Sequence, residues 1–157
     1  MDTRRYQKAL YRLFFLSVGL PILAVAFTAI WFSDVPEVEQ EVTNYAFTAL
    51  LTILFSMFLG FIFFRKNIKK AYASDDLKEK LVIFAKSFQL KMSFFVIAGL
   101  VPSFLSIMAN FYMIVILVII PVAGILLSRP TLYSISQHIP LNEEESEILE
   151  KKIKIED

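Results

Sequence analysis

The chain has 157 residues, of which 57% are hydrophobic and 15% aromatic, an apolar share above that of ordinary soluble domains and indicative of a chain that lies in lipid. Its 16 basic and 15 acidic residues nearly cancel, so net charge favours neither a nucleic-acid partner nor an acidic substrate. It contains no cysteine, which excludes disulfides, thiolate metal sites, iron–sulfur clusters and cysteine nucleophiles.

The first stretch without charged residues covers residues 13–33 and follows an N-terminal region, residues 1–12, with four basic side chains. Its 21 residues match the length of one helical crossing and predict a transmembrane helix. A cleaved signal peptide is the competing interpretation, because residues 24–26 read Ala-Val-Ala and resemble a cleavage site. The chain stays apolar through Trp31 and Phe32, beyond that site, so we favour the membrane helix.

A second uncharged stretch, residues 42–64, predicts a second transmembrane helix of 23 residues. The connection before it, residues 34–41, holds four acidic and no basic side chains. The loop after it, residues 65–91, holds eight basic and three acidic ones. Because positive charge accumulates in cytoplasmic loops, we expect the N-terminus and residues 65–91 on the cytoplasmic side.

The cytoplasmic loop over residues 65–91 has two further features. Four basic residues at its start are expected to contact lipid headgroups, although the predicted orientation alone explains the same charges: Arg65, Lys66, Lys69 and Lys70. Further along, apolar residues recur at helical spacing and predict a short amphipathic helix at the membrane interface: Leu77, Leu81, Phe84 and Phe88. The alternative is an extension of the third transmembrane helix into the cytoplasm.

The third uncharged stretch, residues 92–128, has 37 residues, almost twice what one crossing needs, and therefore predicts a helical hairpin. We divide it at Asn110, because Asn tolerates the left-handed backbone conformation that tight turns often use. The two helices are expected over residues 90–109 and 111–128. Lys91, at the start of the first, is expected to extend toward the headgroups.

Together these elements predict an all-α integral membrane protein, a four-transmembrane-helix bundle over residues 1–128 with both termini in the cytoplasm, placed in the bacterial inner (plasma) membrane. Residues 129–157 form an acidic tail with seven acidic and four basic side chains. Asn142 and Glu145 have the spacing that caps a short helix, expected over residues 143–154. This helix would dock to a partner or onto the basic loop; the alternative is a frayed tail, since short isolated helices are marginal.

Small and weakly polar residues recur every three or four positions in each predicted transmembrane helix. In lipid, such rows mark the faces where helices approach one another. The rows of the second and third helices are candidates for helix packing or for lining a path for a small solute: Thr48, Thr52, Ser56, Gly60, Gly99, Ser103, Ser106 and Asn110. None of the predicted helices places a charged residue in its middle, which weighs against proton-coupled transport.

The sequence offers no arrangement typical of catalysis or cofactor binding. All four glycines lie in apolar stretches, so there is no phosphate-binding loop. The single histidine, His138, excludes a haem held by two histidines or a three-histidine metal site, and we expect it to be exposed in the tail. Asp75, Asp76 and Glu79 could serve a lipid-headgroup enzyme, but their spacing is that of a helix cap. We therefore predict no catalytic residue, metal or cofactor.

The resulting hypothesis is a small non-enzymatic integral membrane protein that acts as an accessory or scaffold subunit of a larger membrane assembly. The expected partners are membrane lipids and other membrane subunits, or further copies of the same chain, and not nucleic acid. The alternative is a small homo-oligomeric transporter or channel, with the row from Thr48 to Gly60 lining the path. A membrane enzyme ranks third.

Overall fold

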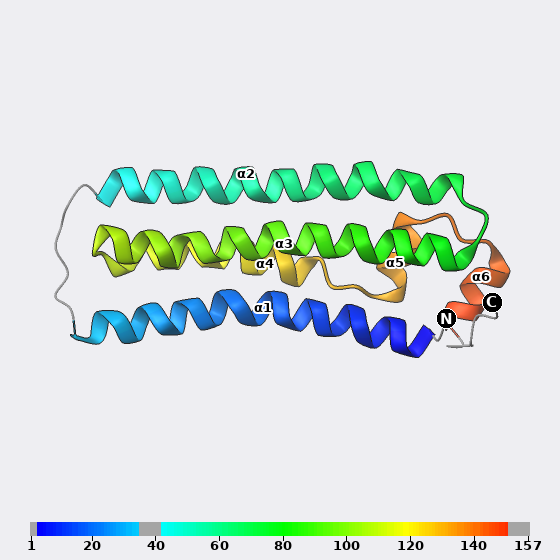
Figure 1. The fold of residues 1–157 in the computed structure, drawn as a ribbon, viewed down its shortest axis with the longest axis horizontal. Coiled ribbons are helices and arrows are strands. Elements are labelled where there is room, and N and C mark those ends of the chain that lie inside the picture. The colour runs from blue at the N-terminus through cyan, green and yellow to red at the C-terminus, as the bar shows by residue number, and fades with distance from the viewer. Residues whose placement is uncertain (1–2, 35–41, 151–157) are drawn as a thin grey trace.

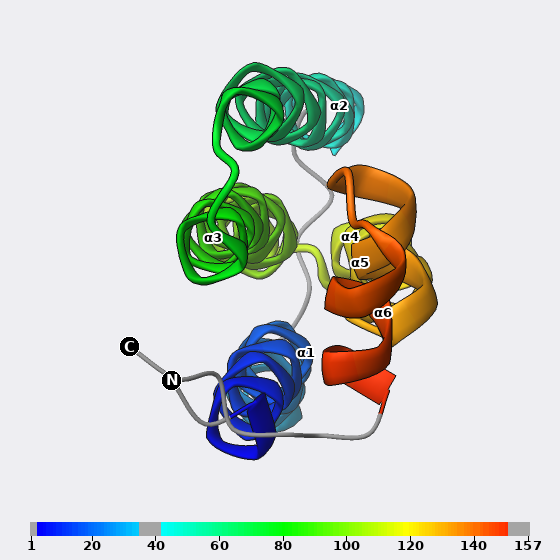
Figure 2. The same cartoon turned by 90° about the vertical axis from the view of Figure 1, so that its right-hand side faces the viewer.

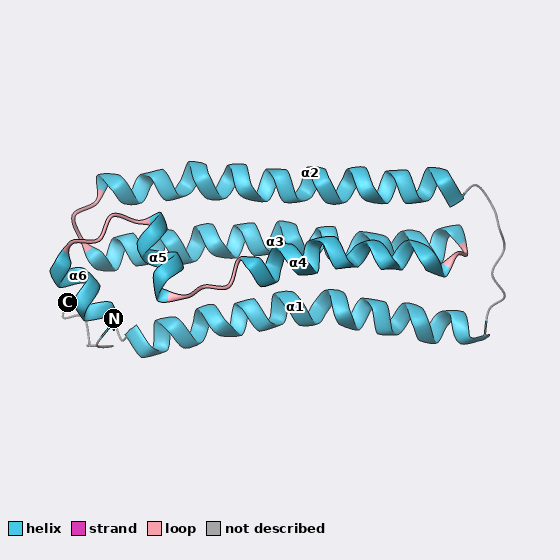
Figure 3. Ribbon diagram, turned by 180° about the vertical axis from the view of Figure 1, so that it is seen from behind, coloured by secondary structure: helices cyan, strands magenta, loops and turns pink. Residues whose placement is uncertain are grey.

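The computed structural model of the chain describes residues 3–34 and 42–150, and these residues form helices and short loops without a strand (Figure 3). Most of the acidic connection and the end of the predicted tail helix, residues 151–154, lie outside the described residues. The α-helices are α1 (Thr3–Asp34), α2 (Val42–Ile68), α3 (Leu77–Ala109), α4 (Ile119–Leu127), α5 (Leu132–His138) and α6 (Glu143–Glu150), and the 3₁₀ helices are η1 (Lys69–Ala73) and η2 (Tyr112–Val118).

Three helical stretches are long and apolar enough to cross a membrane: Thr3–Ser33, Thr43–Ala73 and Leu77–Ala109. Large apolar side chains point away from the protein along α1 and α2, for example Phe27 and Phe55, which are about three-fifths exposed. Each helix is longer than the uncharged stretch that predicts it. The flanking residues are mostly Arg, Lys, Gln, Ala and Leu, which also favour helix, so the helices continue beyond the apolar core.

The helix α3 lies between α1 and α2, and these three long helices run side by side (Figure 1, Figure 2). On one side of this row, η2 and α4 turn back along α3. The short helices α5 and α6 lie at the end of the bundle where α1 begins and where η1 joins α2 to α3 (Figure 1). This end is called the α6 end below.

The predicted amphipathic segment forms the first turns of α3 and is not a separate helix. The chain has neither glycine nor proline over residues 77–98, so nothing interrupts the helix there. The four apolar residues of this segment are buried against the rest of the protein. They belong to one apolar cluster with Tyr6 of α1, Ile135 of α5 and Leu149 of α6.

The chain turns at Asn110, which ends α3 in the left-handed conformation with a φ of 49°. The segment that follows differs from the α-helix expected over residues 111–128, because Phe111 is extended and the next seven residues form the 3₁₀ helix η2. These residues include four β-branched side chains, which restrict the α-helix. The α-helix begins at Ile119, two residues before Pro121, because proline is tolerated in the first turn of a helix.

The buried core is concentrated at the α6 end. The larger apolar cluster joins α1, α2, η1 and α3 to α5 and α6, whereas a smaller cluster around Ala49, Ala109 and Ile114 lies near the opposite end. The buried hydroxyl of Tyr6 donates a hydrogen bond to the Leu81 carbonyl, at 2.9 Å, and fastens the start of α1 to α3. The C-terminal helices are therefore part of the packed protein at this end.

Candidate functional site

A cavity of about 670 Å³ lies between α2, α3, α4 and α5. Aromatic side chains of α2 and α3 and aliphatic side chains of α4 form most of its wall. The polar residues that line it are Lys91 of α3, Ser128 after α4, and Ser134 and His138 of α5. A mostly apolar cavity of this size with a few polar groups is typical of sites for small molecules.

Lys91 is the one lysine that faces this cavity, and its side chain is only 8% exposed. The sequence predicts that Lys91 reaches the headgroups, but its ammonium lies among aromatic rings, 4.5 Å from the ring centre of Phe61, 5.3 Å from that of Phe64 and 5.5 Å from that of Phe95. Within the described part of the chain it has neither a carboxylate partner nor a hydrogen bond.

The aromatic rings compensate only part of the cost of burying the Lys91 ammonium. A cation–π contact is worth about 0.5–2 kcal/mol, depending on how far it is removed from water. Transferring an ammonium from water to a protein interior costs several kcal/mol even after the surroundings relax. The charge of Lys91 is therefore only partly compensated by the protein, and its side chain faces the cavity.

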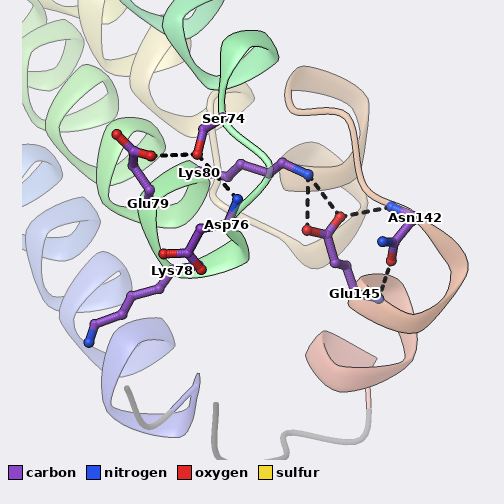
Figure 4. A network of polar contacts seen from close by, with 7 residues as sticks. All are labelled: Ser74, Asp76, Lys78, Glu79, Lys80, Asn142 and Glu145. Atoms are coloured by element: carbon purple, nitrogen blue, oxygen red, sulfur yellow. Dashed lines mark hydrogen bonds and ion pairs between the residues drawn. The ribbon is translucent and has the colours of Figure 1, made fainter. Parts of the chain in front are cut away.

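A second buried lysine on α3, Lys80, has a complete ion pair with the C-terminal segment (Figure 4). Its ammonium lies 2.9 and 3.0 Å from the two carboxylate oxygens of Glu145, and both side chains are more than nine-tenths buried. Glu145 also accepts a hydrogen bond from the Asn142 amide, at 2.8 Å, and donates its own amide to the Asn142 side chain, at 2.7 Å. The predicted cap of the tail helix is thus present and also docks the helix onto α3.

At the start of α3, Asp76 caps the helix and Glu79 of its first turn binds the segment before it. Asp76 accepts a hydrogen bond from the Lys78 amide at 3.0 Å, and Glu79 accepts one from the Ser74 hydroxyl at 2.6 Å (Figure 4). No group of three His, Asp or Glu side chains among the described residues is arranged to hold a metal ion. These contacts favour the capping role that their spacing predicts.

His138 is half-buried, so the expectation that it is exposed is wrong. Its ring packs edge-on against Phe64, with ring centres 5.1 Å apart, and its Nδ1 lies 2.6 Å from the Ser134 carbonyl oxygen. The carbonyl can only accept, so this hydrogen bond requires the proton on Nδ1. Ile135, three residues earlier on the same face of α5, is fully buried, so this face of α5 packs against the protein.

The small-residue row of α2 has a mixed environment. Thr48 is exposed, Thr52 is half-buried and donates its hydroxyl to the Thr48 carbonyl at 2.8 Å, and Ser56 is buried. Gly60 packs against α3, since a Cβ there would lie 3.1 Å from the Cβ of Phe94. The buried end of this row, at Gly60, therefore lies at the contact between α2 and α3.

The row of α3 lies at a different contact. A Cβ at Gly99 would lie 2.7 Å from the Cγ of Pro21 in α1. Ser103 and Ser106 are buried, and Asn110 is the half-buried turn. The rows of α2 and α3 thus reach two different interfaces, and a path lined by both remains a prediction.

The four basic residues predicted to contact headgroups, Arg65, Lys66, Lys69 and Lys70, are all exposed. They stand at the end of α2 and in η1, where Arg65, Ile68, Lys69 and Tyr72 line a shallow hollow of about 420 Å³. Tyr72 is 62% exposed beside them. An aromatic ring beside lysines is common at the headgroup level, and contact with headgroups stays a prediction.

The outer face of α1 has a hollow at Gly19. A Cβ at Gly19 would meet no atom within 4 Å, whereas a Cβ at each of the other three glycines would contact a neighbouring helix. Exposed side chains of the same helix, including Phe15, Leu20 and Leu23, surround the hollow, whose volume is about 440 Å³. Gly19 is therefore a small residue on a face without a neighbouring helix among the described residues.

Comparison with known proteins adds no family or fold assignment to these observations. No protein-family model, curated protein or solved structure matches this chain.

Proposed function

We propose that this chain is a non-enzymatic integral membrane protein of the bacterial inner membrane and serves as an accessory or scaffold subunit of a larger membrane assembly. Its four apolar helical segments cross the bilayer, with the N-terminus and the C-terminal tail in the cytoplasm. The three long apolar helices support the membrane placement. The excess of basic residues in 65–91 and the acidic residues of 34–41 support the orientation.

The observation that carries the subunit role is the hollow at Gly19. Glycine weakens a helix interior by roughly 0.5–1 kcal/mol relative to alanine, so a glycine on a lipid-facing surface is a cost without a benefit inside this chain. In membranes, small residues allow the backbones of two helices to approach closely. We infer that a transmembrane helix of another subunit packs against α1 at Gly19.

Site-specific photo-crosslinking in the native membrane tests this contact. A photoreactive amino acid at Leu23, beside the hollow, is expected to form an adduct with a distinct membrane protein. The same amino acid at Leu54, an exposed leucine on α2, serves as the matched control and is expected to give no such adduct.

The variant Gly19→Leu is expected to abolish the Leu23 adduct while the chain keeps its helix content, because a Cβ at this position meets no atom of the chain within 4 Å and the rest of the side chain fills the hollow. An adduct that survives Gly19→Leu, or no adduct at all, contradicts the proposed contact. An adduct between two copies of this chain contradicts the accessory-subunit role and favours a homo-oligomer.

A further inference from the structure

The two buried lysines of α3 differ in one respect that points to a ligand. Lys80 and Lys91 are about three helical turns apart on the same side of α3, and both side chains are more than nine-tenths buried. Lys80 is neutralised by Glu145 of the same chain. Lys91 faces the cavity instead, and no carboxylate is among the residues that line it.

The walls of the cavity indicate what kind of anion would bind there and neutralise the charge of Lys91. The cavity that Lys91 faces is lined by Phe61 and Phe64 of α2, Phe84 and Phe88 of α3, and aliphatic residues of α4. A small hydrophilic anion would lose its hydration among these side chains without replacement, whereas a hydrocarbon chain gains by burial there. A single cation in an apolar cavity is therefore complementary to an amphiphile with an anionic head.

Two of the other polar groups that line the cavity already have hydrogen bonds within the chain. The Ser128 hydroxyl donates to the Gly124 carbonyl at 2.7 Å, and His138 Nδ1 bonds to the Ser134 carbonyl. Among the lining residues Lys91 is the one lysine, and its ammonium donates no hydrogen bond within the described part of the chain. We propose that this cavity binds a lipid with an anionic head group, its head on the Lys91 ammonium and one acyl chain against the aromatic and aliphatic walls.

A free fatty acid and an anionic phospholipid share this chemistry, and a competition assay separates them. The full chain in phosphatidylcholine nanodiscs is loaded with the fluorescent fatty acid cis-parinarate, which is then displaced by oleate or by oleyl alcohol. Oleate is expected to displace it at a concentration at least about tenfold lower than oleyl alcohol, because the alcohol has no charge for Lys91.

Two variants test the head and the chain of the ligand separately. Lys91→Met is expected to weaken oleate binding by about 10-fold to 100-fold and to leave oleyl alcohol unchanged, whereas Lys86→Met, an exposed lysine of the same helix, changes neither. Ala123→Phe, on the cavity wall contributed by α4, is expected to weaken the binding of both ligands, because the new ring occupies the space of their hydrocarbon chain.

Each outcome bears on the proposal. Displacement by phosphatidylglycerol in the nanodisc but not by oleate identifies a phospholipid as the source of the head group and supports the site. Oleate affinity that is unchanged in Lys91→Met or in Ala123→Phe overturns it, as does displacement by inorganic phosphate at the concentration that oleate requires. The cavity does not include Gly19, so these results are independent of the proposed partner subunit.

Discussion

Gly99 and Gly19 lie at the two opposite extremes of crowding among the glycines of this chain. At Gly99 a Cβ would lie 2.7 and 2.8 Å from two ring carbons of Pro21, and a proline ring in the middle of α1 cannot rotate away. At Gly19 a Cβ would enter open space. Introducing alanine at each position separates the effect of packing on stability from the effect of helix propensity.

We predict that Gly99→Ala lowers the free energy of unfolding by about 1–3 kcal/mol, the usual cost of overpacking a close contact. Gly19→Ala is expected to raise it by up to about 1 kcal/mol, since alanine favours the helix and meets no neighbour. Unfolding by SDS in mixed micelles, followed by circular dichroism, measures both. Equal effects of the two substitutions would show that the approach of α1 and α3 at Gly99 does not constrain the fold.

At the scale of the elements, the short helix α6 depends on its contacts with other parts of the chain. An isolated helix of this length is marginal in water, so its order must come from docking. The docking contacts are the buried Leu149 in the large apolar cluster and the Lys80–Glu145 pair, which joins α6 to the start of α3. A buried pair is costly to break, because removal of one partner leaves the other charge uncompensated.

Glu145→Gln is therefore expected to release α6 while the long helices stay intact. Losing one partner of a buried pair costs about 3–5 kcal/mol, but undocking of α6 lets Lys80 reach water and limits the loss to the docking free energy. Hydrogen exchange of the α6 amides should accelerate at least about tenfold, or about 1.4 kcal/mol.

Two further variants make the Glu145 result specific. Glu144→Gln, an exposed acid of the same helix, serves as the control and should leave the exchange of α6 unchanged. The double variant Lys80→Met, Glu145→Leu should restore much of the protection, because an apolar pair of similar size needs no neutralisation. If α6 exchanges equally fast in every variant, the ion pair has no role in docking.

At the scale of the whole molecule, the sequence predicts the long helices well and the buried polar sites poorly. Long stretches without charge and the tolerance of Asn for the left-handed conformation are properties of the chain itself, so the three long apolar helices and the turn at Asn110 follow from them. The burial of Lys91 and His138 depends on rings from α2 and on the return of α5 along the bundle. Neither is visible in the residues beside them.

For the fourth apolar segment, the length of the α-helix and the sequence pattern disagree on whether the segment crosses the membrane. The α-helix α4 has nine residues, too few for a crossing, but the 3₁₀ helix before it rises more steeply, about 2.0 Å per residue against 1.5 Å. Together η2 and α4 therefore span about 27 Å, close to the roughly 30 Å of a bilayer core. We predict that they cross.

The absence of native cysteine makes this crossing directly measurable by labelling single-cysteine variants with a membrane-impermeant maleimide in intact cells and in inverted vesicles. Cysteines at Lys70 and Glu144 should react from the cytoplasmic side, because both are exposed at the α6 end of the bundle. A cysteine at Asn110 should react from the opposite side. Labelling of Asn110 and Glu144 from the same side would mean that η2 and α4 do not cross, so that α5 and α6 could not lie in the cytoplasm beside η1.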